Sequence, residues 1–252
     1  MTPFASAMAR CARLDEDALA QKWSFRDKPM DVRYALYRTL EDTQEALVSA
    51  AAGAHPESRR ILALAQRSFE DLRGLLIGLP DDLLDKAPRP GEWPVREVLR
   101  HIVWIERRYA VQTLYAVERA DAEPIRIPDA RLPALAHVDV SGDVATVLAR
   151  IGEARAETDE RLGNLAPAAM TRPTMWVSYD VDVRFRLHRF AAHVTEHTVH
   201  CEKTLGALGW QATEGRRIVR RIWSLLGELE GLGASAAARD IEARLVERVA
   251  SI

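Results

Sequence analysis

The stretch Arg186-Leu-His-Arg-Phe-Ala-Ala-His193-Val-Thr-Glu-His197-Thr-Val-His200-Cys-Glu-Lys-Thr-Leu decides the fold of this chain. Four of the seven histidines fall inside it, and three of them recur at i, i+4 and i+7. On a helix these three side chains lie within roughly 60° of one another. The same stripe carries the apolar residues Leu187, Phe190, Val194, Cys201, Leu205 and Leu208. The imidazoles therefore point toward neighbouring elements and not toward water. A buried polar group without a partner costs on the order of 1–3 kcal/mol, and one metal ion can serve as the partner of several imidazoles.

The composition is that of an ordinary globular protein. Hydrophobic residues make up 48% and charged residues 29% of the 252 residues, and the formal net charge is −2. No basic block stands out, which argues against nucleic acid as a partner. No apolar run approaches the roughly 18–20 residues of a membrane span, and no signal peptide is recognisable. Two distant cysteines, Cys11 and Cys201, suit a reducing compartment, so we expect a cytoplasmic protein that does not bind membranes.

Helical spacing of apolar residues dominates the chain. It predicts helices over residues 31–52, 56–78, 95–117, 141–165, 183–208, 214–232 and 235–250. Asp31 and Ser141 are the expected N-caps, and Gly209 is the expected residue after the histidine helix. The Pro-broken segment 121–140 predicts a long loop that crosses the bundle, while 167–182 is irregular with a short extended piece after Met175.

These elements predict an all-α fold, a four-helix bundle with a long crossover loop and additional N- and C-terminal helices. We divide the chain into an N-terminal helical extension (1–55), the bundle (56–210) and a C-terminal helical extension (211–252). No repeat at solenoid spacing is evident.

A third histidine strengthens the case for a metal site. His193 and His197 have the i, i+4 spacing that lets two imidazoles on one helix bind one ion, but the pair alone is as easily two unrelated histidines. His101 lies on the apolar side of a different helix, so a bundle can bring it opposite the pair. Three imidazoles without a thiolate suit an open, catalytic site for Zn, Ni, Fe or Co.

Other polar residues of these helices are candidates for supporting roles around the site. We interpret His200 as a residue that lines the site or holds a ligand by hydrogen bonding, in preference to a fourth ligand. Glu97, one turn before His101, is a candidate acceptor for a ligand histidine's other ring nitrogen. The remaining histidines and Cys201 are interpreted as outward, turn or core residues: His55, His137, His188 and Cys201.

Two sequence motifs resemble the DinB/YfiT-like superfamily. They are Trp93-x-Val-x-Glu-Val-Leu-x-His101 and His193-x-x-x-His197, and the resemblance covers about residues 57–210. It implies a four-helix bundle in which His101, His193 and His197 bind a divalent metal, often zinc or nickel. It also implies a homodimer. Many members have Gln where this chain has His200.

The resemblance also suggests an activity. Characterised members include enzymes that use a low-molecular-weight thiol, such as mycothiol-dependent maleylpyruvate isomerase, and thiol S-transferases. The leading hypothesis is therefore a metal-dependent thiol transferase or isomerase that acts on a small electrophilic molecule. Residues of the irregular segments are candidates for the pocket: Trp93, Trp176 and Tyr179 as apolar contacts, and Arg184 and Arg186 as anion clamps.

Two other functions stay open. The string His193-Val-Thr-Glu196-His197 also matches the H-x-x-E-H pattern of some metalloproteases, in which the glutamate is the general base. A non-enzymatic helical module is the other alternative, with the flanking helices docking a partner and the metal structural or absent.

Overall fold

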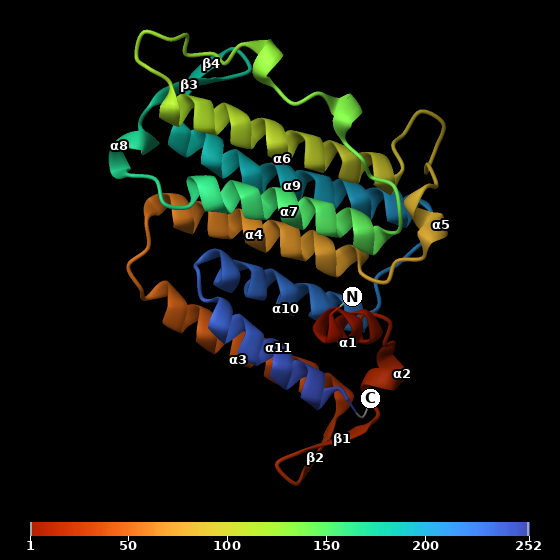
Figure 1. Cartoon of the computed structure of the whole chain (residues 1–252). Helices are drawn as coiled ribbons and strands as arrows, with labels where there is room; N and C mark the ends of the chain where they lie inside the picture. Colours follow the sequence, from red (N-terminus) through yellow and green to blue (C-terminus); the bar gives the residue numbers. More distant parts are fainter. Residues whose placement is uncertain (1, 251) are drawn as a thin grey trace.

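Four long helices form one bundle in the computed structural model, which describes residues 2–250 and 252. They are α4 (Glu57–Leu76), α6 (Val95–Glu118), α7 (Val144–Leu162) and α9 (Val183–Ala207). Each helix packs against two others, so that the order around the bundle is α4, α9, α6, α7 (Figure 1). Their apolar faces meet in two buried clusters, which include Phe69, Ile102 and Leu187. The predicted all-α fold is confirmed.

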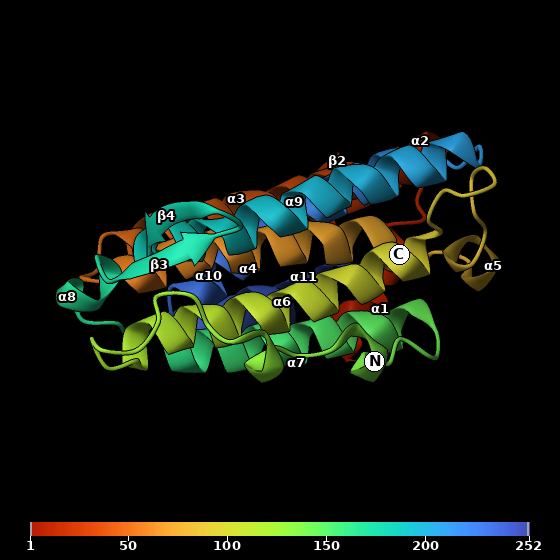
Figure 2. The ribbon, with the colours of Figure 1, turned by 90° about the horizontal axis from the view of Figure 1, so that it is seen from above.

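Long connections join the later helices of this bundle. The short helix α5 (Asp81–Leu84) precedes α6, and residues 119–143 then cross from α6 to α7 through the 3-10 turns η1 (Asp129–Arg131) and η2 (Leu135–His137). Between α7 and α9 lie the short helix α8 (Pro167–Met170) and the hairpin of β3 (Pro173–Trp176) and β4 (Tyr179–Asp182). Figure 2 shows the crossover passing over α6. The predicted crossover loop is therefore present.

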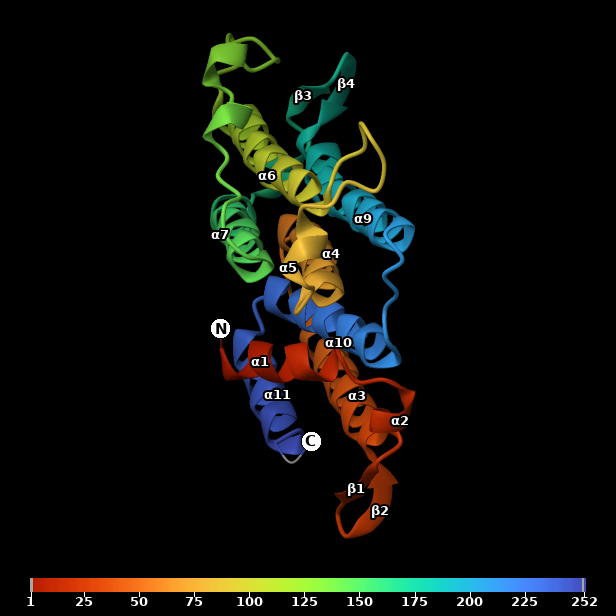
Figure 3. The same ribbon diagram turned by 90° about the vertical axis from the view of Figure 1, so that its right-hand side faces the viewer.

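The segments at the two ends of the chain pack together as a second helical layer. It comprises α1 (Pro3–Cys11), α3 (Val32–Ala51), α10 (Glu214–Gly231) and α11 (Ser235–Arg248), with the short helix α2 (Glu16–Leu19) and a hairpin of β1 (Lys22–Phe25) and β2 (Lys28–Asp31). These elements share one buried cluster, which includes Met8, Leu36, Trp223 and Leu245. Figure 3 shows this layer below the first bundle, with the two hairpins at opposite ends of the molecule.

The two layers contain related hairpin-and-helix units. Residues 31–38 read Asp-Val-Arg-Tyr-Ala-Leu-Tyr-Arg, and residues 182–189, which lie 151 positions later, read Asp-Val-Arg-Phe-Arg-Leu-His-Arg. The hairpin registers agree at the same offset, since Lys22 pairs with Asp31 and Pro173 with Asp182. Both aspartates cap the following helix, because each accepts a hydrogen bond of 2.8 Å from the backbone N–H three residues later.

The same relation extends to ion pairs between helices. Arg33 on α3 binds Glu214 at the start of α10 through two hydrogen bonds, one of them 3.0 Å between Nη2 and Oε2. Arg184 on α9 binds Glu57 at the start of α4 in the same way, with 3.2 Å between the corresponding atoms. The chain therefore holds two copies of one arrangement. The separation of 151 residues is far longer than the periods of solenoid repeats.

Helices α4 and α10 form the contact between the layers and approach closely because glycines face the partner helix. A Cβ at Gly74 would lie 2.8 Å from the Cα of Arg220, and one at Gly231 would lie 2.6 Å from the Cα of Ala63. The two helices therefore run antiparallel with their backbones in near contact. This packing joins the terminal segments firmly to the bundle that carries the histidines.

Several local predictions differ from the structure. In residues 1–30 the sequence suggests only a short helix that begins near Asp15, and α2 follows Asp15 as its N-cap; α1 and the first hairpin are additional elements that no sequence pattern indicated. The N-cap of α7 is Asp143 and not Ser141, because the Asp143 carboxylate accepts the N–H of Thr146 at 2.8 Å. In the part of the chain that the structure describes, no helix is both long enough and apolar enough to span a bilayer.

Candidate metal centre

Three histidines from two helices meet inside the first bundle. His101 lies in the second turn of α6, and His193 and His197 lie on the inner face of α9, one helical turn apart. The capping of α9 by Asp182 and the packing of α6 against α9 fix the relative rotation of the two helices. His193 and His197 are buried, and His101 is half-buried at the mouth of the group.

The ring nitrogens of these residues converge on one point. The Nε2 atoms of His101 and His193 are 3.2 Å apart. One nitrogen from each of the three residues lies within 4.8 Å of the others, and this is the only such group of three His, Cys, Asp or Glu side chains among the residues described. The ring centroids are 4.4–5.1 Å apart. The sequence prediction that His101 lies opposite the pair therefore agrees with the geometry.

Burial keeps these imidazoles neutral. Desolvation, reinforced by the neighbouring imidazoles, lowers the pKa of His193 to about 3 and the pKa of His197 to about 4. Desolvation also lowers the pKa of His101. Neutral imidazole is the form that binds metal, because the lone pair is then free.

The donor set fits a divalent ion. Two nitrogen ligands at about 2.0–2.1 Å from a tetrahedral ion are roughly 3.3 Å apart, close to the observed 3.2 Å between His101 and His193. His197 Nδ1 is buried without a hydrogen-bond partner in the described structure, whereas buried polar atoms normally have one. Three neutral nitrogens with no thiolate define an open site for Zn, Ni or Fe.

Aromatic rings form the wall around the three histidines. The Trp93 ring lies 5.4 Å from the His101 ring and stacks on His200 at 6.3 Å. The His200 ring in turn lies 6.0 Å from that of His197. Trp104 lies 5.8 Å from His101, and Tyr109 lies 5.5 Å from His193. His200 and Trp93 are thus at the site, as the sequence suggested.

No sequence motif marked Trp104 or Tyr109 as residues of the site. Both follow His101 on α6, at the i+3 and i+8 positions, where a helix presents side chains near the same face. The helical spacing from His101 is the signal that identifies both rings as neighbours of the site.

Three further charged residues that the sequence suggested for the site are bound to other groups of the protein. Glu97 forms an ion pair with Arg100, and Arg184 pairs with Glu57 and Asp182. Arg186 is buried and donates to the Met175 carbonyl oxygen at 2.6 Å and to the Gln112 amide oxygen.

The hairpin residues lie farther from the histidines, and Cys201 belongs to the hydrophobic core. Trp176 packs on Tyr109 with 5.1 Å between ring centroids, whereas Tyr179 is 65% exposed. Cys201 is buried, and desolvation raises the pKa of its thiol to about 12, which keeps the thiol protonated. Cys201 is therefore a core residue, as expected, and Trp176 reaches the site only through Tyr109.

A cavity of about 260 Å³ lies next to the histidines, where the crossover loop meets the β3–β4 hairpin. Tyr109 separates it from His193. Three arginines line this cavity, Arg108, Arg126 and Arg186, against one carboxylate, that of Asp129. The cavity therefore favours an anion. The sequence pointed to Arg186 alone, because the loop that brings Arg126 here has no helical period.

The second layer lacks an equivalent histidine group. The positions 151 residues before His193 and His197 are Asp42 and Ala46 on α3. Asp42 is buried and accepts hydrogen bonds from Arg38 and, at 2.6 Å, from Arg248. An ion-pair network thus takes the place of the imidazoles, and the paired charges leave no neutral nitrogen for a metal.

The lowered histidine pKa values predict acid sensitivity of the metal-free protein. Below about pH 6.5 the unfolded histidines take up protons while the folded ones do not, so the free energy of unfolding falls as pH decreases toward the folded values of about 3 and 4. Each of these two buried histidines should lower the free energy of unfolding at pH 5 by about 2 kcal/mol relative to its value at pH 7. Urea unfolding in the presence of a chelator measures this loss. The variant His193→Gln/His197→Gln should lose about 3–4 kcal/mol less over that interval; equal losses would contradict the account.

The fold and the histidine group together define a four-helix-bundle protein with an open three-histidine site. The sequence profile of the DinB superfamily matches residues 64–200, which is more than half of the chain. The protein belongs to the DinB superfamily.

A solved structure supports the fold. YfiT from Bacillus subtilis, described as "a probable metal-dependent hydrolase with an unusual four-helix bundle topology", superposes with a TM-score of 0.50 at 16% sequence identity. The similar region covers 64% of this chain and 93% of YfiT. No protein of curated function matches the chain.

Proposed function

We propose that this protein is a divalent-metal-dependent enzyme and that His101, His193 and His197 hold the ion. The observation that supports this most strongly is the convergence of three neutral imidazole nitrogens from two helices within 4.8 Å. Burying three imidazoles together costs free energy unless a ligand pairs with them. The open side of the group, next to the half-buried His101, leaves access for a substrate.

The ion would supply Lewis acidity, which activates a nucleophile at neutral pH and polarises the group under attack. The chain's own residues provide the surroundings. Trp93, Trp104 and Tyr109 form an aromatic wall beside the site. His200 is half-buried between Trp93 and His197, where its imidazole is placed to hold or transfer a proton.

The substrate in this proposal is a small electrophile with an anionic group. The arginine-lined cavity beside Tyr109 supports this, because three guanidinium groups face one carboxylate there. Arg108 and Arg126 are the residues that would bind the anion, since the guanidinium of Arg186 already donates to Met175 and Gln112. The ion pair of Arg126 with Asp129 is 3.7 Å long between exposed side chains, and a pair of this kind contributes little that an anion would have to replace. Its volume of about 260 Å³ suits a small molecule better than a peptide.

The nucleophile in our leading proposal is a low-molecular-weight thiol, as in the superfamily members that act as thiol S-transferases or isomerases. Hydrolysis, with water as nucleophile, is the second candidate, and the description of YfiT as a probable metal-dependent hydrolase favours it. Proteolysis through the H-x-x-E-H string is less favoured, because Glu196 is exposed and stands outside the group of converging nitrogens. A cytoplasmic homodimer stays a prediction.

A screen of paired reactions tests the proposed function. Untagged protein is assayed with 4-chloro-3,5-dinitrobenzoate, an anionic electrophile, and cellular thiols, and in parallel with small anionic esters and amides without thiol. We expect turnover in at least one arm, loss of that turnover with chelator and its return with Zn²⁺ or Ni²⁺. Turnover that survives complete chelation would remove the metal from the mechanism. An ion bound without turnover in either arm would favour the helical module.

A further inference from the structure

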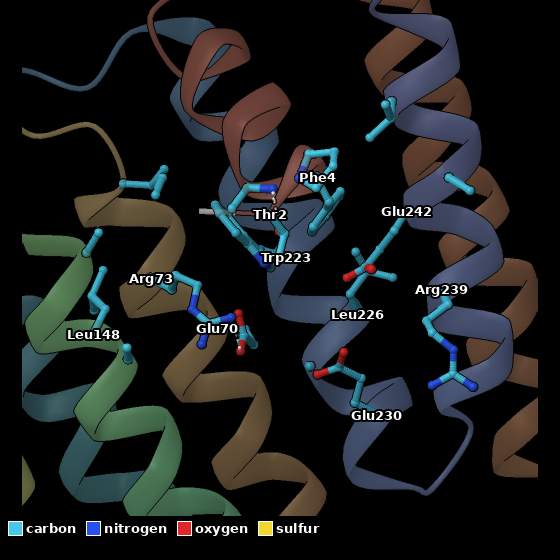
Figure 4. Close-up of a pocket in the computed structure, with 18 of the residues that line it drawn as sticks. Thr2, Phe4, Glu70, Arg73, Leu148, Trp223, Leu226, Glu230, Arg239 and Glu242 are labelled. Atoms are coloured by element: carbon cyan, nitrogen blue, oxygen red, sulfur yellow. Dashed lines mark hydrogen bonds and ion pairs between the residues drawn. The ribbon is translucent and has the colours of Figure 1, made fainter.

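A second and larger cavity lies between the two layers, away from the histidines. Its volume is about 1090 Å³, and its walls come from α4, α7, α10 and α11 together with the start of α1. In the second layer, α1 takes the place that α7 has in the first bundle, since Cys11 and Leu162, their last residues, are also 151 positions apart. However, α1 has 9 residues whereas α7 has 19. The shorter α1 leaves the faces of α10 and α11 open at this end. Figure 4 shows the side chains that line the space.

Glu70 on α4 is the most unusual residue of this cavity. Its side chain is 98% buried (2% exposed), and its Oε2 atom has no hydrogen-bond partner in the described structure. The other carboxylate oxygen accepts from Gln66 at 3.3 Å and pairs with Arg73 at 3.0 Å. A buried carboxylate oxygen without a donor costs on the order of 1–3 kcal/mol or more, so a ligand that donates to it gains this free energy.

Carboxyl groups outnumber guanidinium groups on the walls of the cavity. Five carboxylates line it, those of Glu70, Asp143, Glu230, Glu242 and Glu247, against the two guanidinium groups of Arg73 and Arg239. Figure 4 shows the carboxylates of Glu70, Glu230 and Glu242 reaching into the space between α4, α10 and α11. Burial raises the pKa of Glu70 to about 8 and also raises the pKa values of Glu230 and Glu242. A positive charge placed among them would favour their ionised forms.

The rest of the wall is apolar. Trp223 and Phe4 pack edge to face with 5.6 Å between ring centroids, and both line the cavity. Leu148 contributes from α7, and Leu226 and Val246 from α10 and α11. An apolar wall with a few convergent polar groups is the usual composition of a small-molecule site. The combination excludes a bare metal ion, which would leave the apolar wall without a partner, and it disfavours an anion.

We propose that this cavity binds a small organic cation, a protonated amine with an aromatic or aliphatic body. The ammonium group would lie among the carboxylates of Glu230 and Glu242 and donate to Glu70 Oε2, which is closed to solvent and would be reached by a rotation of the Glu70 carboxylate toward the cavity. The apolar body would pack on Trp223, Phe4 and Leu226. This site is separate from the histidine centre and does not depend on the activity proposed for it.

Three probes with one ring system and different charges test the proposal. They are naphthylethylamine, naphthylethanol and naphthylacetate, and binding to the full-length protein is measured by calorimetry and by Trp fluorescence. The amine should bind saturably, the alcohol at least about tenfold more weakly, and the acid not at all, because only the amine donates a charged hydrogen bond to Glu70. Equal affinities for amine and alcohol, tighter binding of the acid, or no saturable binding of the amine would overturn the proposal.

Variants locate the binding. Glu70→Gln should weaken the amine at least about tenfold and leave the alcohol within about twofold, because the amide keeps the shape but not the charge. Glu242→Gln, at a half-buried position on α11, should weaken the amine by a smaller factor and provides the test if Glu70→Gln fails to fold. Glu118→Gln, on the exposed end of α6, and His193→Ala should leave amine binding unchanged. Unchanged amine binding in both Glu70→Gln and Glu242→Gln would place the probe elsewhere.

Discussion

Replacing His193 by alanine is expected to abolish metal-dependent turnover. The substitution removes one of three nitrogens that converge within 4.8 Å and opens space beside the buried His197. Loss of an outer hydrogen-bond partner of a metal ligand typically costs 10–100-fold, and loss of a ligand itself should cost more, about 1000-fold or beyond in kcat/KM. The measurement is the rate with the best substrate of the screen at saturating metal.

His188→Ala is the matched control for that prediction. His188 lies on the same helix but is exposed and stands outside the histidine group. This variant should keep its turnover within about twofold, because substitutions of exposed residues away from a site have small effects. Equal losses in the two variants would show that the helix, and not the three-histidine group, is what turnover requires.

The second large effect is a loss of stability, expected when a buried ion pair in the interior of the same bundle is broken. Arg155→Met should destabilise the protein by about 3–5 kcal/mol, because it leaves the Glu106 carboxylate buried without its partner. Arg155 and Glu106 are 1% and 2% exposed, and Arg155 Nη1 donates to Glu106 Oε1 at 2.6 Å. Thr158 Oγ1 also donates to Glu106 Oε1, at 2.8 Å, and cannot replace the charge. Urea unfolding at neutral pH measures the change.

A double substitution separates the charge from the packing. In Glu106→Gln/Arg155→Met neither charge of the buried pair remains, and only Asp159, which is 20% exposed and accepts from Arg155 at 2.7 Å in the wild type, loses its partner, so much of the lost stability should return. Arg161→Met, at an exposed position on the same helix, should change stability by no more than about 0.5 kcal/mol. A double variant as unstable as Arg155→Met would show that the packing of the Arg155 side chain, and not the unpaired charge, dominates.

The long amphipathic helices could be predicted from the sequence, because their apolar residues recur with the helical period over many turns. His101 was matched with His193 and His197 for the same reason, since each lies on the inner stripe of its helix. The hairpin at residues 22–31 was not recognised. Its strands have four residues each and Pro29 interrupts the second, which hides the alternation that identifies a strand.

Features that depend on contacts between distant segments could not be predicted. Arg186 looked like a free cation in the sequence, but it donates to Met175 and Gln112. The relation between residues 31–38 and 182–189 is short and 151 residues apart, so it becomes clear only when the hairpin registers and the ion pairs are compared. The cavity around Glu70 combines residues from both ends of the chain with the middle, and no local pattern marks it.

The number of metal ions per chain tests the central claim most directly. Elemental analysis of protein purified without a histidine tag should find one divalent ion per chain, because the first bundle has the three histidines and the second layer has Asp42 in an ion-pair network. His193→Ala should contain almost none, and His188→Ala should match the wild type. A wild-type protein that stays metal-free after incubation with Zn²⁺, Ni²⁺ and Fe²⁺, or an ion retained in full by His193→Ala, would contradict the account.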